Sequence, residues 1–356
     1  MKKIGIITIH FPYNYGAMLQ AYATQVYLED NGYNSEIIDF RPYEIDKNYH
    51  IRAEMIVRDP KLFCLLIACK MLGKRKKYNN FDYFLNKYIK KSKKKYRKIS
   101  ENTSLPYDLV VAGSDQIWNP EIIQNRYEYL LAFNCKEKIS YASSVGLSSL
   151  SKQEMAKYYG YLKQFRMLSV REESAVKILN EMSFESVSKV CDPVFLLNKK
   201  HWINMEKRPD CFIDSKYVLI YSLQDNCDMN SLAKLYASKH NYPIVSIHPL
   251  GKKNCIADYC LDDIGPLEFL YLINHAEMVF SNSFHAVCFS IIFNTKICPF
   301  LHTVTGTRVK NLISQFSLDA EYEDEIKYYI NSNKSQQKID EIVDYSKEYF
   351  KKALEI

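Results

Sequence analysis

Six short runs that each contain Ile or Val alternate with stretches of helical spacing in the first half of the sequence. The runs cover residues 3–9, 35–40, 107–112, 138–142, 167–170 and 187–190. The helical stretches include residues 16–31, 151–165 and 172–181. Short apolar runs bounded by turn-forming residues are typical of strands buried on both faces. Strands that alternate with helices predict an α/β fold with a parallel sheet of the Rossmann type.

The same alternation starts again near residue 215. Strands are expected at 217–221, 244–248, 278–281 and 296–300, and helices at 230–240, 266–276, 284–293 and 307–316. We therefore predict two Rossmann-like domains, residues 1–197 and 215–356, that face each other across a cleft as in the glycosyltransferase-B architecture. Residues 198–214 join them, and an amphipathic terminal helix at 337–354 is expected to pack back on the N-terminal domain. A chain of 356 residues has the length of two such domains.

A basic segment interrupts the first alternation. Residues 44–100 are predicted to form a helical insertion, and the part 70–98, with 13 Lys or Arg and one Asp, accounts for the positive net charge of +7. Such a cluster of Lys and Arg is either a solvated helix face or a surface that attracts anionic lipid or a phosphate-bearing acceptor. Nucleic acid is not expected as a partner, because no recognition module accompanies the charge.

The cysteines and the apolar runs indicate the cellular compartment. Ten cysteines show no C-x-x-C pair and no metal-site spacing, so we expect buried, reduced thiols and no metal. The apolar run 62–69 is far shorter than the roughly 20 residues that a membrane span needs. The run 4–9 is followed by Pro12 and by no small-residue cleavage site, which favours a strand over a signal peptide. These features predict a soluble, cytoplasmic protein.

Two polar loops follow predicted strands of the first domain, where α/β folds bind their ligands. In the first, Asn14 and Gly16 lead into a helix whose free N–H groups favour an anionic or polar ligand. The second loop carries four candidates for sugar contacts: Ser114, Asp115, Gln116 and Trp118. The alternatives are a plain turn eased by Gly16, and capping of a helix by Ser114 or Asp115.

Two further loops place a cation and an imidazole at helix starts. Arg171 stands at the first turn of a predicted helix, where the helix dipole disfavours positive charge. Either an anion bound there or a salt bridge to a nearby carboxylate would explain it. His285 begins the apolar helix 284–293, after Asn282 and Ser283, and is a candidate acid/base, although a lone His is more often structural.

Taken in order, the motifs resemble the polysaccharide pyruvyl transferase family. They are Asn14-x-Gly16-x-x-x-Gln20, Val111-Ala-Gly-Ser-Asp-Gln-Ile-Trp118, Ser140-Tyr-Ala-Ser-Ser-Val-Gly146, Ser169-Val-Arg-Glu172, Cys191-Asp-Pro-Val-Phe-Leu196, Ser281-Asn-Ser-Phe-His-Ala286 and Thr307-Arg-Val-Lys-Asn-Leu312. Each motif alone is weak, but seven in sequence over most of the chain are specific.

The resemblance implies an enzyme of glycosyltransferase-B type fold that moves the pyruvyl group of phosphoenolpyruvate onto a sugar diol, with release of phosphate and no further cofactor. The acceptor would be a bacterial surface polysaccharide, such as a capsule or exopolysaccharide, or its lipid-linked precursor. His285 would then be the catalytic acid/base, and Arg171 would bind the donor and take part in catalysis. A lipid-linked acceptor would suit peripheral contact of the segment 70–98 with the inner face of the membrane.

The remaining residues are assigned from the same resemblance. Distant members carry Arg two residues before the catalytic His, where this chain has Ser283, so Arg308 is the candidate for the missing donor cation. The donor-binding set is Arg171, Asn282, Ser283, Arg308, Asn14 and Gly16. The acceptor-binding set is Ser114, Asp115, Gln116, Trp118 and Asp192.

Two other functions stay open on the sequence. A sugar-nucleotide-dependent glycosyltransferase of the same fold type would need a carboxylate pair for ribose, and no E-x7-E pair occurs in the C-terminal half. A non-catalytic sugar-binding paralogue is the other alternative, because Ser283 departs from the pattern of distant members.

Overall fold

The computed structural model describes residues 2–46, 75–210, 215–248, 254–261, 263–301 and 307–355. Its first lobe contains a parallel sheet of strand order β2-β1-β3-β4. These strands are β1 Lys3–Ile7, β2 Asn34–Ile37, β3 Leu109–Ala112 and β4 Lys138–Ser140. A parallel pair, β5 Leu168–Val170 and β6 Val187–Lys189, continues beside β4 through a bridge between Ile139 and Met167.

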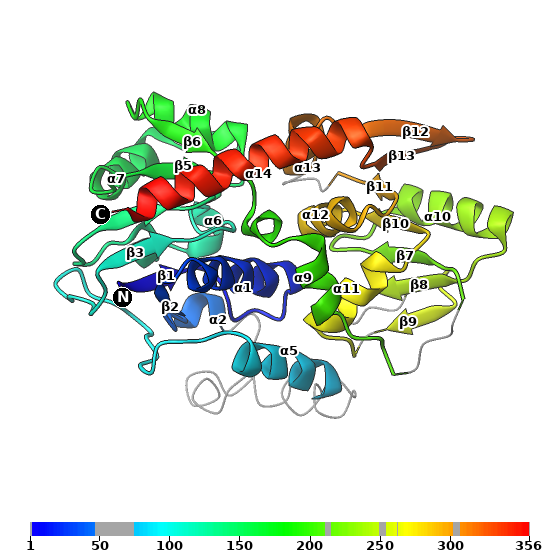
Figure 1. Cartoon of the computed structure of the whole chain (residues 1–356), viewed down its shortest axis with the longest axis horizontal. Helices are drawn as coiled ribbons and strands as arrows, with labels where there is room; N and C mark the ends of the chain where they lie inside the picture. Colours follow the sequence, from blue (N-terminus) through cyan, green and yellow to red (C-terminus); the bar gives the residue numbers. More distant parts are fainter. Residues whose placement is uncertain are drawn as a thin grey trace.

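The second lobe contains a seven-stranded sheet of order β12-β13-β11-β10-β7-β8-β9. Its parallel centre consists of β7 Val218–Tyr221, β8 Ile244–Ile247, β9 Tyr259–Leu261, β10 Met278–Ser281 and β11 Ile297–Pro299. An antiparallel hairpin, β12 Asp319–Glu323 and β13 Ile326–Ile330, closes one edge. Figure 1 shows the two lobes side by side, each with its own sheet.

The helices cover both sheets, and two 3-10 turns, η1 and η2, complete the set. The helices of the first lobe and the connection are α1 Tyr15–Asp30, α2 Tyr43–Asp46, α5 Arg75–Lys87, α6 Pro120–Ile123, α7 Lys152–Leu162, α8 Glu173–Glu181 and α9 Lys199–Met205, with η1 Tyr127–Leu130 and η2 Pro193–Leu196. The second half adds α10 Cys227–His240, α11 Pro266–Asn274, α12 Phe284–Phe293, α13 Thr307–Gln315 and α14 Asn333–Leu354. The predicted class, two parallel α/β sheets with helices between their strands, is confirmed.

One helix and three strands of the connection and the second lobe were not expected from the sequence. Helix α9 lies within the connection 198–214, and strands β9 and β12–β13 extend the second sheet. Strand β9 has only three residues, and β12 is an edge strand whose three central residues, Ala320 to Tyr322, are exposed. Such strands lack the continuous apolar run by which a buried strand is found in a sequence.

The segment 44–100 differs from the predicted helical insertion. Residues 47–74, which include the apolar run 62–69, lie outside the described residues. Residues 88–98 are not helical but run along the edge of the first sheet, with parallel bridges from Lys91 to Ile37 and from Tyr96 to Phe40. Pairing with a strand some 50 residues earlier is a tertiary effect that local helical propensity does not reveal.

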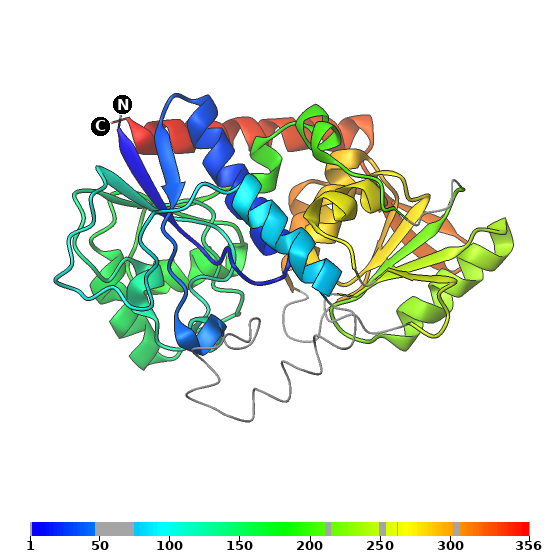
Figure 2. The ribbon, with the colours of Figure 1, turned by 90° about the horizontal axis from the view of Figure 1, so that it is seen from below.

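Helix α5 contacts both lobes instead of standing in solvent. The Phe81 ring packs on Tyr15 of α1, with 5.0 Å between ring centroids. On the other side, Asn80 Nδ2 donates to the carbonyl oxygen of Asp263 at 2.8 Å, and Lys76 Nζ lies 2.8 Å from the carboxylate of Asp263. Figure 2 shows α5, in cyan, lying across the junction of the two lobes.

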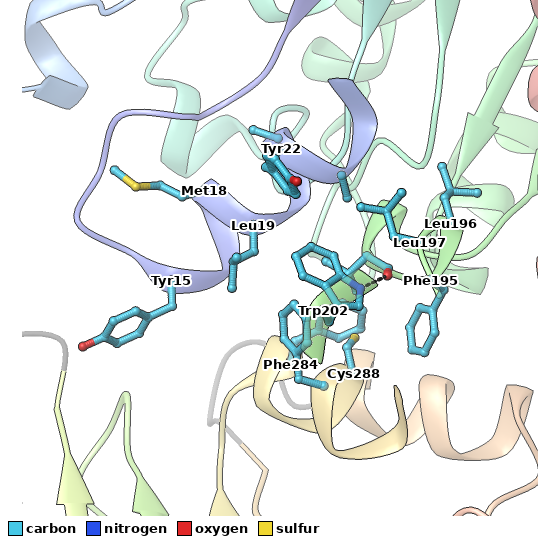
Figure 3. Packing of buried hydrophobic residues seen from close by; sticks show 14 of the residues in the cluster. Tyr15, Met18, Leu19, Tyr22, Phe195, Leu196, Leu197, Trp202, Phe284 and Cys288 are labelled. Carbon is cyan, nitrogen blue, oxygen red and sulfur yellow. Dashed lines mark hydrogen bonds between the residues drawn. The ribbon is translucent and has the colours of Figure 1, made fainter. Parts of the chain in front are cut away.

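The two lobes are also joined through a shared hydrophobic cluster. In Figure 3, Leu19 of α1 lies near Trp202 of α9 and Phe284 of α12. Tyr15 of α1 points away from them and stacks on Phe269 of α11, with 4.6 Å between ring centroids. The Trp202 side chain is fully buried, and its Nε1 donates to the carbonyl oxygen of Val194 at 3.0 Å. Because apolar burial provides most of the stability of such contacts, the lobes form one packed unit.

The terminal helix α14 crosses from the second lobe to the first (Figure 1). There the Phe350 ring stacks on Tyr141 and Tyr27, at centroid distances of 4.2 and 5.5 Å. Tyr349 Oη donates to the carbonyl oxygen of Ser140 at 3.2 Å, at the end of β4. The N-terminal lobe is therefore completed by the last helix of the chain.

The expectation that the cysteines are buried holds for only some of them. Cys191, Cys288 and Cys298 are buried as predicted, but Cys227 and Cys255 are exposed. Cys64, Cys69 and Cys211 lie outside the described residues. In the part of the chain that the structure describes, no helix has both the length and the apolar character for crossing a membrane.

Candidate active site

The starts of two helices, one from each lobe, meet at Gly16 and His285. Asn14 caps α1, since its Oδ1 accepts from the N–H of Ala17 at 3.1 Å. Ser283 caps α12 in the same way, although its contact with the N–H of Ala286 is longer, at 3.5 Å. A Cβ atom on Gly16 would lie only 2.1 Å from Nδ1 of His285, so the imidazole lies directly against the α1 backbone. Any larger residue at position 16 would overlap with that ring.

The other ring nitrogen of His285 faces a buried carboxylate. Its Nε2 lies 3.6 Å from Oδ2 of Asp192, just beyond hydrogen-bonding distance. Asp192 follows β6 and caps η2, because its Oδ1 accepts from the N–H of Val194 at 3.1 Å. The Asp192 side chain is fully buried and that of His285 is 10% exposed. Such a carboxylate stabilises a protonated imidazole beside it.

Arg171 is surrounded by three carboxylates. Its Nη1 donates to Asp192 Oδ2 at 2.6 Å, and Asp115 and Glu172 each have an oxygen 3.6 Å from the guanidinium. Burial alone would lower the pKa of Arg171, but these three charges outweigh it and hold that pKa above its usual range. Burial alone would raise the pKa of Asp192, yet His285 and Arg171 hold it well below its usual range. The ion pair is therefore charged at neutral pH, and the charge of Arg171 is compensated inside the protein.

Glu172 anchors the loop that follows β4. Its Oε1 accepts from Oγ of Ser144 at 2.8 Å and from the N–H groups of Val145 and Gly146, both at 2.9 Å. The sequence analysis placed Glu172 in a motif without giving it a role. The role of Glu172 could have been inferred from two features of the sequence. A carboxylate directly follows Arg171 at the end of a predicted strand, and a Ser-rich loop follows the neighbouring strand.

A second guanidinium, that of Arg308, shares the same aromatic ring as Arg171. The central carbon of Arg171 lies 4.4 Å from the Phe284 ring centroid, and that of Arg308 lies 5.6 Å from it. Within the described residues no carboxylate forms an ion pair with Arg308. Burial, followed by repulsion from Arg171, lowers the pKa of Arg308 to about 10. Arg308 is thus a half-buried cation, with a buried Nε atom, whose charge is not directly paired within the described residues.

Several donors around this point lack an acceptor. The buried nitrogens without a hydrogen-bond partner among the described residues include Nε and Nη2 of Arg171, Nε of Arg308 and Nε2 of His285. A cavity of about 10 Å³, room for one water molecule, lies between Arg171, Asp192, Phe284 and Arg308. The Asp115 and Glu172 carboxylates lie 3.6 Å from the two Arg171 nitrogens, beyond hydrogen-bonding distance, so these donors can still bind an oxyanion. Guanidinium groups bind carboxylate or phosphate especially well.

The sequence model of one family matches the chain over a segment that contains Arg171, Asp192 and His285 but ends before Arg308. Its description is polysaccharide pyruvyl transferase, and it covers residues 14–303. The chain belongs to the polysaccharide pyruvyl transferase family. A comparison with curated protein sequences gave no significant match.

This member of the pyruvyl transferase family is similar in structure to two UDP-GlcNAc 2-epimerases among the solved structures. That of Methanocaldococcus jannaschii has a TM-score of 0.45 at 14% identity, with 97% of this chain and 100% of the epimerase covered. That of Neisseria meningitidis has a TM-score of 0.44 at 10% identity, with 99% and 94% covered. The glycosyltransferase SnogD from Streptomyces nogalater has a TM-score of 0.41 at 9% identity, with 99% of both chains covered.

The family motifs of the first lobe are connected by hydrogen bonds. Gln20 Nε2 donates to Oγ1 of Thr8 at 3.0 Å, and that hydroxyl donates to the carbonyl oxygen of Ser114 at 2.8 Å. Ser114 Oγ in turn donates to Asp192 Oδ2 at 3.3 Å. Asp115 has a φ of 71°, a left-handed conformation that Asp tolerates better than most residues. The loops containing Gly16, Ser114 and Asp192 are therefore parts of one cluster.

Other predicted residues shape the loops around this cluster. Asn282 joins the ends of two strands, because its Oδ1 accepts from the N–H of Leu223 and its Nδ2 donates to the carbonyl oxygen of Gln224, both at 2.7 Å. Gln116 Oε1 accepts from Nδ2 of Asn119 at 3.1 Å. No group of three or more His, Cys, Asp or Glu residues in the described ranges is arranged to hold a metal ion.

The structure contradicts the sugar contact expected of Trp118. Its side chain has no exposed surface, and its Nε1 donates to the carbonyl oxygen of Tyr129 at 3.3 Å. A ring must expose a face in order to stack on a sugar. The large apolar area of Trp118 is instead used in the core of the first lobe, which includes Phe165 at 6.1 Å between ring centroids.

Proposed function

We propose that this protein transfers the pyruvyl group of phosphoenolpyruvate to a sugar diol of a bacterial surface polysaccharide or its lipid-linked precursor. The product is a cyclic ketal, and inorganic phosphate is released. One observation carries the proposal: in a chain of this family, unpartnered donors from His285, Arg171 and Arg308 converge at the junction of the lobes. The starts of α1 and α12 add two positive dipole ends beside His285, which also favour an anion.

The proposed reaction needs one group that both gives and takes a proton. Protonated His285 gives a proton to C3 of the donor, and C2 becomes an oxocarbenium-like centre that one sugar hydroxyl attacks. That hydroxyl returns its proton to His285. The second hydroxyl then forms the other C2–O bond as the bond to phosphate breaks, and its proton leaves with the phosphate. Asp192 stabilises the imidazolium, since its carboxylate lies 3.6 Å from Nε2.

The two arginines have different parts in this proposal. Because three carboxylates already compensate Arg171, its main contribution is to hold Asp192 beside His285, while its unpartnered nitrogens complete the donor site. Arg308 carries the charge that the donor phosphate or carboxylate would neutralise. Asn14 and Gly16 present the start of α1, and Asn282 and Ser283 that of α12. Asp115, which is half-buried, is proposed to face the acceptor from the first lobe. The Ser114 hydroxyl has no exposed surface and donates to Asp192, so Ser114 supports the site and does not contact the acceptor.

The test is incubation of the purified protein with phosphoenolpyruvate and candidate glycans, followed by mass spectrometry for the added ketal and by a phosphate assay. His285→Ala is expected to abolish both signals, because no other described group lies in its place. His275→Ala is the matched control, since His275 is exposed at the end of α11.

Nucleotide release from a sugar nucleotide would favour the glycosyltransferase alternative. Glycan binding without turnover would favour the non-catalytic one.

We further propose that residues 88–98, the described basic loop of the segment 70–98, contact anionic lipid at the inner face of the membrane. Lys93, Lys94 and Lys98 are exposed there, and clustered Lys residues are attracted to anionic headgroups. Changing these three to Gln should reduce sedimentation with phosphatidylserine vesicles. The control changes Lys334, Lys351 and Lys352, which are exposed on α14. Equal sedimentation of both variants and the wild type would contradict the membrane contact.

A further inference from the structure

A second cavity lies at the far end of α12, the helix that carries His285 in its first turn. Its volume is about 590 Å³, within the usual range of about 300–1,000 Å³ for small-molecule sites. It is bounded by η2 and the start of α9, by the C-terminal end of α12, by the turn that follows β13, and by α14. Since α12 has ten residues that rise about 1.5 Å each, this groove lies about 15 Å from the His285 end of the helix.

One buried acceptor in the groove has no donor. Asn331 lines the groove, and its Nδ2 donates to the carbonyl oxygen of Ile291 at 3.4 Å and to Oε1 of Gln336 at 2.6 Å. These two bonds fix the orientation of the amide. The Oδ1 atom of Asn331 is then buried with no hydrogen-bond partner among the described residues. A buried acceptor in this state is stabilised by any ligand that brings an O–H or N–H group.

The charges of the groove exclude a strongly charged ligand. Lys199 and Lys347 line it together with Asp340 and Asp344, so two positive and two negative groups balance. Lys199 Nζ donates to the carbonyl oxygen of Phe293 at 2.6 Å, and Asp340 accepts from Gln336 at 2.7 Å. Within the described ranges, the carboxylate of Asp344 has no such partner.

The remaining lining combines aliphatic carbon with amides. Ile292 and Val343 supply apolar surface, and Asn294 and Asn333 supply further amide groups on the rim. Aliphatic surface fits the C–H faces of a sugar ring, while amides and carboxylates fit its hydroxyl groups. An uncharged, hydroxyl-rich chain therefore matches the groove better than an anion or a lipid.

We propose that this groove binds an uncharged segment of a sugar chain, outside the reaction site around His285. The choice of ligand class rests on the proposed function, because a polysaccharide acceptor extends beyond the two hydroxyls that react. The groove is formed where the chain crosses between the lobes, at η2–α9 and at α14. A bound sugar chain would thus contact both crossings and the helix of His285.

The test measures binding of lactose, cellobiose and chitobiose to the full chain by saturation-transfer NMR and titration calorimetry. At least one of the three is expected to bind. Asn331→Leu and Asp344→Asn should each weaken that binding about 5–10-fold, as expected for one lost hydrogen bond. Glu348→Gln is the matched control, because Glu348 is an exposed carboxylate on the same helix that does not line the groove.

Absence of binding for all three sugars, or unchanged binding in both Asn331→Leu and Asp344→Asn, would overturn the proposal. Asp344→Asn keeps the test valid if Asn331→Leu fails to fold, since Asp344 is exposed. The readout does not need catalysis. Sugar binding that depends on Asp344, without ketal formation, would support the groove and contradict the proposed reaction. Ketal formation without sugar binding at the groove would contradict the groove alone.

Discussion

Replacement of Gly16 by Ala is expected to displace the imidazole of His285. The new Cβ would lie 2.1 Å from Nδ1, whereas ordinary contact begins at 3.4 Å, so the ring or the helix start must move by about 3.4 − 2.1 = 1.3 Å. The nearest atoms are Nδ1, Cγ and Cβ of the same side chain, so the whole imidazole must move away from α1. Because α12 is packed on all sides, the movement cannot be absorbed freely.

The magnitude follows from this displacement. A misplacement of about 1 Å at a reacting group lowers a rate about 100-fold, and overpacking a core costs about 1–3 kcal/mol. We therefore expect Gly16→Ala to lower phosphate release from phosphoenolpyruvate about 100-fold and to lower the free energy of unfolding by about 1–3 kcal/mol. Phosphate release and urea unfolding are measured on the same preparation.

Gly160→Ala is the control for this change. Gly160 lies inside α7, and a Cβ there would meet no atom within 4 Å. Alanine in a helix interior is favoured over glycine by about 0.5–1 kcal/mol, so this variant should be slightly more stable and fully active. If Gly16→Ala were as active and as stable as the wild type, the contact between the two helix starts would be wrong, and with it the proposed site.

The other predictions concern charges and the core. Arg171→Met should lower the free energy of unfolding by about 3–5 kcal/mol in urea, because three buried or half-buried carboxylates lose their partner. Arg308→Met should not lower stability, since it removes an unpaired, half-buried charge, but should weaken phosphoenolpyruvate binding at least about tenfold in calorimetry. The depressed pKa of Asp192 contributes stability above about pH 4 that is lost as the pH falls further, so urea unfolding of Asp192→Asn should depend less on pH below 4 than that of the wild type. Trp118→Phe should cost about 1–3 kcal/mol of stability and leave the acceptor KM unchanged, and a raised KM would contradict the buried position of the ring.

Local patterns were sufficient for most of the secondary structure. The predicted strand 278–281 and helix 284–293 coincide with β10 and α12, and helix 266–276 differs from α11 only at its end. Periodicity and turn chemistry act within a few residues, so they can be recognised in one sequence. Helix α9 was missed because it has only seven residues and its one fully buried side chain, Trp202, packs on both lobes.

The sequence also determined which loops form the site. Gly16, Ser114, Arg171, Asp192 and His285 all follow strands, and the carboxyl ends of parallel strands meet at one edge of each sheet. The family resemblance rested on the same loops, and the family model covers them.

Only the tertiary structure decided how these residues are used. The charge of Arg171 is compensated by Asp192, Asp115 and Glu172. The Trp118 side chain is buried in the core of the first lobe, and the His285 ring lies against Gly16. A sequence pattern records the residue type and the local conformation. Burial and charge compensation depend on side chains that are far apart in the chain and meet only after both lobes have packed, so no local pattern contains them.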